Sequence, residues 1–176
     1  MIEGWGRPNA KSTPMNGLRI EAPPIFLNLK NKMDREYYKE KGFELYAIMV
    51  ASDKYKQGID IMYPSGHKQS KSDNQPAVYI LTNREGKLLK IGETQNLTSR
   101  FHKGYRCISN STNDKIREHV KNVENIWVYV LPMPIVTSKV LGYKCNTSFV
   151  KGLEYNLLHE FVEKVGNLPE LNAAKI

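Results

Sequence analysis

Three side chains suited to phosphate chemistry lie close together in this sequence: Tyr79, Lys90 and Arg100. The planar guanidinium of arginine can hold two phosphate oxygens at once and offset negative charge in a transition state. A tyrosine hydroxyl can orient or deprotonate a water molecule. Its ordinary pKa near 10 makes it a poor base at neutral pH, so nearby cations such as Lys90 and Arg100 must help. Together these groups suit hydrolysis of a phosphodiester.

A carboxylate stands in an unexpected place later in the chain. Glu154 falls at the edge of the apolar stripe of a predicted helix over residues 148–165. An unpaired carboxylate loses hydration at a buried face, so it needs a partner. The partner is either a cation such as Lys151, one turn away, or a metal ion. Mg²⁺ suits a single carboxylate because it keeps most of its water shell, and Mn²⁺ is a possible substitute.

A compact β-hairpin brings the first groups together. Residues 78–81 and 88–91 are short apolar runs, and residues 83–86 supply turn chemistry between them. Gly92 ends the second strand, and Thr94 or Asn96 then caps a short helix that carries the arginine.

This stretch resembles the GIY-YIG nuclease family. Ala77-Val78-Tyr79 stands where that family has Gly-Ile-Tyr, and Lys90-Ile91-Gly92 where it has Tyr-Ile-Gly. The segment from Gly92 to Arg100 matches the family's Gly-x-Thr-x-Asn-Leu-x-x-Arg at every fixed position. Two departures are Ala77 for glycine and Lys90 for tyrosine. The lysine variant is similar to that of some type II restriction endonucleases in the family.

The resemblance implies an α+β fold, in which helices flank a small three-stranded antiparallel sheet. It also implies a metal-dependent DNA endonuclease with Glu154 as the metal ligand. The family places a His or Tyr about one turn after the arginine; Gly104 occupies that position here, so His102 or Tyr105 is the candidate, and helical phase favours Tyr105. Its late asparagine corresponds to Asn172. The size and placement of the N-terminal extension are similar to those of a site-specific type II restriction enzyme.

The rest of the chain predicts two parts. Residues 1–75 form an N-terminal arm and helical extension, and residues 76–176 form the catalytic core. The arm carries Arg7, Lys11 and Arg19 on a segment with costly apolar residues, and is either a partly disordered tail or a DNA-contacting arm. Further candidate DNA contacts are Lys103, Arg106 and Asn172.

Secondary structure outside the hairpin is predicted from periodicity and caps. Asp34 caps a helix that continues through about Lys56, and residues 59–62 form a short strand. A linker covers residues 63–75. The remaining elements are a helix over residues 112–121 capped by Thr112 or Asn113, a third strand over residues 126–131, an irregular stretch over residues 136–146 and the final helix.

Composition is consistent with a DNA-binding protein of the cytoplasm. The formal net charge is +8, and a basic surface favours a polyanion through counterion release. No apolar run is long enough to span a bilayer, and the first residues do not resemble a secretion signal. The two cysteines and four histidines lack zinc-ligand spacing. Double-stranded DNA is the expected partner, and a homodimer is possible.

Other functions and other kinds of nuclease remain open. One is a structure-specific or mobile-element and phage-type endonuclease of the same family. Another is an inactive module that only binds nucleic acid, although the presence of Glu154 argues against it. A small-molecule enzyme is disfavoured because no glycine-rich phosphate loop and no Ser/His/Asp set is present.

Overall fold

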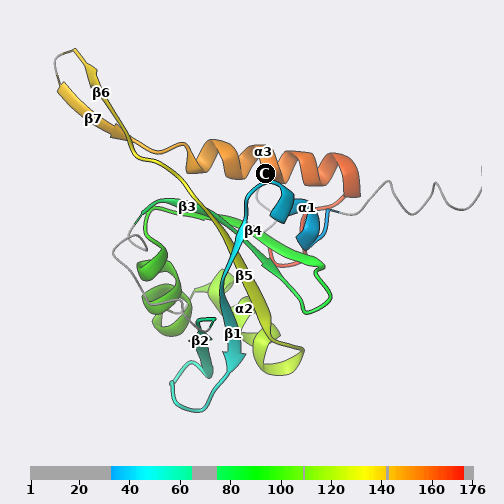
Figure 1. Cartoon of the computed structure of the whole chain (residues 1–176). Helices are drawn as coiled ribbons and strands as arrows, with labels where there is room; N and C mark the ends of the chain where they lie inside the picture. Colours follow the sequence, from blue (N-terminus) through cyan, green and yellow to red (C-terminus); the bar gives the residue numbers. More distant parts are fainter. Residues whose placement is uncertain (1–32, 65–74, 109, 142, 173–176) are drawn as a thin grey trace, which may run out of the picture.

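The described chain places helices on both faces of one antiparallel sheet (Figure 1). The computed structural model describes residues 33–64, 75–108, 110–141 and 143–172. The helices are α1 (Arg35–Glu40), the π-helix η3 (Ser99–Tyr105), α2 (Ser111–Asn122) and α3 (Val150–Val165). The strands are β1 (Glu44–Ala51), β2 (Ile59–Met62), β3 (Ala77–Thr82), β4 (Leu88–Thr94), β5 (Ile126–Pro132), β6 (Val136–Val140) and β7 (Tyr143–Thr147).

The main sheet has five strands in the order β2-β1-β5-β3-β4, so the predicted three-stranded sheet is too small. The three predicted strands are present as β3, β4 and β5. Two further strands, β1 and β2, extend the sheet beyond β5. Both come from the segment before residue 76, so this part of the N-terminal extension belongs to the same sheet as the core.

The predicted helix through Lys56 is wrong beyond Glu40. Asp34 does cap α1, since its carboxylate accepts from the backbone N–H groups of Glu36 at 3.1 Å and Tyr37 at 3.3 Å. Gly42 then ends the helix with a left-handed φ of +89°, which glycine adopts without strain. The apolar run that follows satisfies its backbone by pairing with β5 rather than with itself.

The predicted hairpin is confirmed as β3 and β4, but Gly92 does not end the second strand, because β4 stays paired with β3 through Thr94. Its turn is closed by the Gly86 N–H, which donates to the Asn83 carbonyl at 3.1 Å, and by the Asn83 side chain, which accepts from the Lys87 N–H at 2.8 Å. Gly86 has a φ of +91°. β3 is buried throughout between β5 and β4, whereas β4 is an edge strand.

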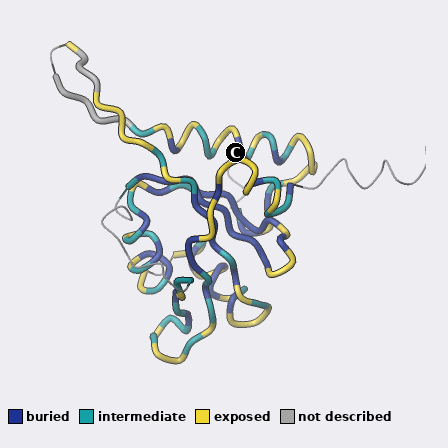
Figure 2. Tube along the Cα trace, in the orientation of Figure 1, coloured by how far each residue is buried: buried dark blue, intermediate teal, exposed yellow. Residues whose placement is uncertain are grey.

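The two faces of the sheet carry two separate clusters of buried residues. The central strands between them are largely buried (Figure 2). One face packs against η3 and α2, through Leu97, Phe101, Tyr105, Ile116 and Val120. The other packs against α1 and α3, through Tyr38, Val150, Leu157 and Phe161. Alternate residues of β3 therefore face different helices, with Tyr79 toward η3 and Val78 and Ile80 toward α3.

The stretch predicted to be irregular instead forms a second, two-stranded sheet of β6 and β7. The other predicted elements are confirmed with shifted ends. α2 begins one residue earlier than expected and is capped by Asn110, whose side chain accepts from the Asn113 N–H at 2.9 Å. α3 begins at Val150 and ends at Val165, and the capping residue Gly166 has a left-handed φ of +89°.

Candidate active site

Tyr79, Tyr105 and Arg100 form one hydrogen-bonded cluster between the sheet and η3. The two phenol oxygens are 2.9 Å apart. The Arg100 Nε donates to the Tyr79 hydroxyl at 3.0 Å, and its second guanidinium nitrogen donates to the Tyr105 hydroxyl at 3.1 Å. Both tyrosines are fully buried. The guanidinium therefore bridges two phenols that are held away from water.

Strand register places Lys90 on the same face of the sheet as Tyr79. Tyr79 is opposite Gly92 and Leu81 is opposite Lys90, and cross-strand partners share a face. The tyrosine ring lies directly over Gly92. A Cβ at that position would lie 2.4 Å from the Tyr79 hydroxyl oxygen and 2.5 Å from the ring carbon that carries it, so no other residue fits there.

Tyr105, rather than His102, completes the cluster. The segment from Ser99 to Tyr105 is a π-helix, whose i→i+5 hydrogen bonding brings residues five apart into neighbouring turns. His102 lies elsewhere, where its Nε2 contacts the Tyr63 hydroxyl at 2.6 Å and its Nδ1 contacts Arg106 at 3.0 Å. Asn96 caps this helical segment by accepting from the Ser99 N–H at 2.7 Å.

Two residues of α2 that sequence reasoning did not single out for the site hold the end of η3. The buried Arg117 donates to the carbonyls of Tyr105 at 2.7 Å and Gly104 at 3.4 Å, and also to the carbonyl of Ile108. Asn113 donates to the Gly104 carbonyl at 3.1 Å. These bonds satisfy carbonyls that the wide helix leaves free. No local pattern in the sequence could have found them, because they act across a loop.

Lys90 and Glu154 interact electrostatically with each other and with Arg100. Lys90 is 7% exposed. Burial lowers its pKa to about 8, the charge of Arg100 acts in the same direction, and Glu154 opposes both. Burial also raises the pKa of Glu154, helped by Glu93 and opposed by Lys90 and Arg100. Lysine, arginine and glutamate thus share one electrostatic neighbourhood although α3 and η3 cover opposite faces of the sheet.

The phenols of the cluster stay protonated near neutral pH. Burial raises the pKa of Tyr79, and the nearby Arg100 offsets that effect only in part. Burial likewise raises the pKa of Tyr105 well above its ordinary value. The expectation that Lys90 and Arg100 would make Tyr79 a base is therefore not supported, because desolvation outweighs the charge of Arg100.

A second acid lies beside Glu154. Glu93 is on β4, and one of its carboxylate oxygens is buried without a hydrogen-bond partner among the described residues. The described ranges contain no group of three or more His, Cys, Asp or Glu that could enclose a metal ion. A cation held here would therefore keep most of its ligands as water, as Mg²⁺ does.

Asn172 contacts the edge of β4. Its side-chain amide accepts from the Ile91 N–H at 2.9 Å and donates to the Ile91 carbonyl at 2.8 Å. It thus takes the place of a neighbouring strand at the residue between Lys90 and Gly92. In this structure its amide is engaged with the protein backbone.

The other predicted DNA contacts are scattered. Lys103 is exposed on η3. Arg106 stacks on Tyr55, with its guanidinium carbon 3.7 Å from the ring centre, and pairs with Asp60 at 3.7 Å. Arg7, Lys11 and Arg19 lie outside the described residues.

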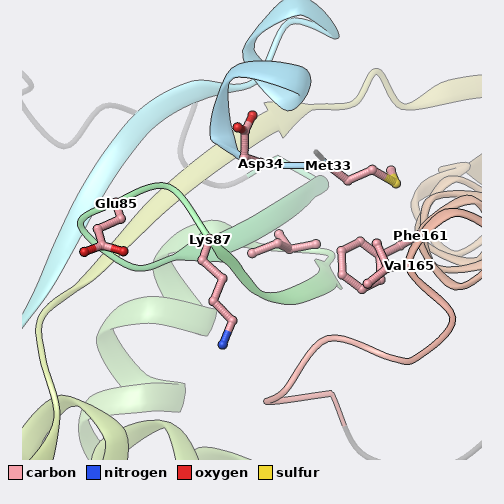
Figure 3. Close-up of a pocket in the computed structure, with 7 residues that line it drawn as sticks. Met33, Asp34, Glu85, Lys87, Phe161 and Val165 are labelled. Carbon is pink, nitrogen blue, oxygen red and sulfur yellow. The ribbon is translucent and has the colours of Figure 1, made fainter. Parts of the chain in front are cut away.

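One of two pockets lies beside this site, and the other lies away from it. A hollow of about 280 Å³ opens beside Arg100, lined by Thr94, Gln95, Asn96, Ser99, Arg100, Gly104 and Ile108. A pocket of about 350 Å³ lies between α1, the β3–β4 turn and the end of α3, and Phe161 and Val165 are among its apolar lining (Figure 3). It contains none of the candidate site residues. Of these two pockets, the hollow beside Arg100 is the one that a candidate site residue lines.

No protein-family model matches the sequence, and no curated protein matches it. Two solved structures are similar. The restriction endonuclease HPY188I in complex with product DNA is 21% identical with a TM-score of 0.51, over 81% of this chain and 87% of that one. A mutant of bacteriophage T4 EndoII is 18% identical with a TM-score of 0.55, over 78% of this chain and 97% of that one. At these identities the likeness establishes that the chain shares the fold of both proteins.

Proposed function

We propose that this chain is a metal-dependent DNA endonuclease of the GIY-YIG family, and more narrowly a site-specific type II restriction enzyme. The observation that carries the proposal is the Tyr79–Arg100–Tyr105 cluster, with Lys90 and Glu154 electrostatically coupled to it. Tyr79, Arg100 and Glu154 stand at the family's motif positions, Lys90 replaces its second tyrosine, and Tyr105 lies one residue past the family's His or Tyr position. The shared fold with HPY188I, a restriction endonuclease solved with product DNA, supports the same assignment.

Each residue has a role in this proposal that follows from its surroundings. Arg100 binds a phosphate oxygen at the hollow beside it and offsets charge in the transition state. The protonated Tyr79 and Tyr105 hold the guanidinium in place. Lys90, with a pKa of about 8, is partly neutral near neutral pH and accepts a proton from the attacking water.

Glu154 is the residue proposed to hold a divalent cation, with Glu93 as its neighbour. The fit rests on the charge of Glu93, which helps to raise the pKa of Glu154, and on the Glu93 oxygen that has no hydrogen-bond partner among the described residues. Mg²⁺ bound there supplies charge stabilisation for the phosphate and the leaving oxygen.

The test is digestion of unmethylated plasmid or phage DNA with Mg²⁺, followed by sequencing of the fragment ends. Discrete fragments with a common end sequence are expected. Glu154→Gln should lower cleavage by at least about a thousandfold while duplex binding in EDTA and the thermal midpoint stay close to wild type. Cleavage by this variant near the wild-type rate would contradict the proposed role of the carboxylate.

A phage-type endonuclease is the second candidate, because the chain covers 97% of the similar T4 EndoII. The same digestion separates the two, since a restriction enzyme leaves one defined end sequence and a less specific nuclease leaves many. A tight mobility shift without cleavage would indicate a binding module instead.

A further inference from the structure

The β6–β7 hairpin projects away from the body of the molecule, past the first turn of α3 (Figure 1). It forms a sheet of its own and pairs with no strand of the main sheet. Ile135, Val136 and Thr137 at its base are exposed, and so is Leu141 at its tip (Figure 2). A two-stranded ribbon of this length has little stability by itself in water. A binding partner would therefore stabilise the projecting hairpin.

Both ends of the hairpin are fastened beside the candidate active site. Before β6, the Met133 N–H donates to the Pro76 carbonyl at 2.8 Å, and Pro132 and Pro134 restrict the backbone on either side. After β7, the Ser148 hydroxyl donates to the Gln95 side chain at 2.8 Å. Gln95 directly follows β4, and α3 with Glu154 begins two residues after Ser148. The hairpin therefore begins and ends next to the strands that carry the candidate site.

The hairpin and its flanks are basic. From residue 125 to residue 153 the chain has three lysines, at positions 139, 144 and 151, and no aspartate or glutamate. Lys139 and Lys144 are direct cross-strand partners. Like charges placed opposite each other destabilise a β-ribbon, so this register favours a partner that is a polyanion. A second copy of the chain, with its net charge of +8, is a poor partner for this ribbon.

The tip residue is unfavourable for the isolated protein in two ways. Leu141 is 92% exposed, and its φ of +51° lies in the left-handed region that favours glycine or asparagine. A turn that served only to reverse the chain would be better made with a small or polar residue there. Apolar side chains at the ends of DNA-binding arms insert into the minor groove between base steps.

We propose that the β6–β7 hairpin is an arm that grips the DNA duplex next to the cleaved phosphate. Lys139 and Lys144 bind backbone phosphates, and Leu141 enters the minor groove. This inference rests on the proposed function, since it requires that the chain act on duplex DNA.

The first test measures how binding to a mixed-sequence duplex depends on salt, in EDTA so that no cleavage occurs. Lys139→Gln/Lys144→Gln should weaken binding roughly tenfold or more and reduce the salt slope by about 2. The matched control is Lys54→Gln/Lys56→Gln, which removes the same charge from two exposed lysines in the β1–β2 loop at the other end of the molecule. Equal losses in both double variants would overturn the proposal, because only total charge would matter.

The second test isolates the tip. Leu141→Asn keeps a residue that tolerates the left-handed region, so folding is preserved. It should weaken duplex binding by about fivefold to tenfold with an unchanged salt slope, because an apolar contact is lost and no phosphate contact is. Val123→Asn is the control, since Val123 is an apolar residue that is 66% exposed at the end of α2.

The outcomes separate the arm from the enzyme. If the protein cuts DNA but the three hairpin changes behave like their controls, the arm proposal is overturned and the proposed function stands. If the unaltered protein neither binds nor cuts duplex DNA, the proposed function is overturned and the arm with it.

Discussion

At the scale of residues, the two phenol groups of the candidate site are buried and hydrogen-bonded to one another. Tyr79 and Tyr105 share one guanidinium, and their burial keeps both phenols protonated. The spacing of Tyr79, Lys90 and Arg100 in the sequence predicted their proximity, because a hairpin and the helix after it are local structures. Arg117 gave no such signal, since its contacts with η3 depend on how α2 packs.

Gly92 is a sharp test of the tyrosine position. Gly92→Ala would put a Cβ 2.4 Å from the Tyr79 hydroxyl oxygen, so the buried ring must move and its bonds to Arg100 and Tyr105 must break. We expect a loss of about 1–3 kcal/mol in the free energy of unfolding, as in overpacked cores, and loss of cleavage. Urea denaturation and plasmid digestion measure the two effects.

Gly152→Ala is the matched control for this change. Gly152 is exposed in α3, and a Cβ there meets no atom within 4 Å. Alanine should stabilise the helix by up to about 1 kcal/mol and leave cleavage unchanged. A Gly92→Ala protein as stable and active as this control would show that the ring does not occupy the described position.

Lys90 predicts a conflict between stability and activity. Its pKa in the folded protein is about 8 against an ordinary value of 10.5. At about 1.4 kcal/mol per pKa unit, keeping it charged below pH 8 costs on the order of 3 kcal/mol. Lys90→Met should therefore stabilise the protein at pH 7 by up to roughly that amount and abolish cleavage.

The pH dependence of that difference checks its cause. Between pH 8 and pH 10.5 the unfolded chain binds more protons at Lys90 than the folded one, so wild-type stability rises with pH in this window. The advantage of Lys90→Met should shrink from pH 7 to pH 10 in urea denaturation. A constant advantage would point to packing instead. Wild-type cleavage should rise through about pH 8, since neutral Lys90 is the proposed base.

At the scale of elements, local patterns predicted some structures and tertiary pairing decided others. The β3–β4 turn was predictable because Asn83 and Gly86 carry its geometry in their own side chains and backbone. β1 was not, because an apolar run of its length fits a helix or a strand, and its pairing with β5 decides. The π-helix was not predictable from the sequence either, because the hydrogen bonds from Asn113 and Arg117 that hold its end come from α2.

Asn172 predicts how the edge of β4 is held. Asn172→Ala leaves both the N–H and the carbonyl of Ile91 without their partner, so we expect a loss of about 1–2 kcal/mol in the free energy of unfolding. Hydrogen exchange at the Ile91 amide should accelerate, and cleavage should fall because Lys90 and Gly92 flank that residue.

Asn167→Ala is the control for this variant, since Asn167 is exposed just after α3. If Asn172→Ala kept the Ile91 amide protected and the stability unchanged but lost affinity for DNA, the asparagine would act as a DNA contact, as its place in the sequence motif first suggested.

At the scale of the whole molecule, the sheet separates two layers of helices, η3 with α2 and α1 with α3. The candidate site lies at the edge strand β4 and includes residues from both layers. Tyr79, Lys90 and Arg100 belong to the η3 face, whereas Glu154 comes from α3 on the other face. β3 and β4 carry residues on both faces, and β4 is the edge strand of the two. A substrate phosphate at this edge can therefore meet groups from both layers.

In the part of the chain that the structure describes, no helix is long and apolar enough to cross a membrane.

The basic N-terminal residues give the prediction that concerns the molecule as a whole. Residues 1–32 contain five basic and two acidic residues, among them Arg7, Lys11 and Arg19. Deleting residues 2–32 keeps Met33, which is 4% exposed in the α3-facing core, and the Asp34 cap of α1. If the three basic residues bind phosphates, the truncated protein should bind duplex DNA more weakly, with a salt slope reduced by about 2 to 3.

The control for this deletion is the full chain with Arg7→Gln, Lys11→Gln and Arg19→Gln, which removes the charges and keeps the segment. Because counterion release depends on charge alone, this variant should reproduce the change in salt slope of the deletion. A deletion effect that the triple variant lacks would assign the segment a packing role. Cleavage at the same sites with unchanged salt dependence by the truncated protein would place residues 1–32 outside the DNA interface and leave the phosphate contacts to the described residues.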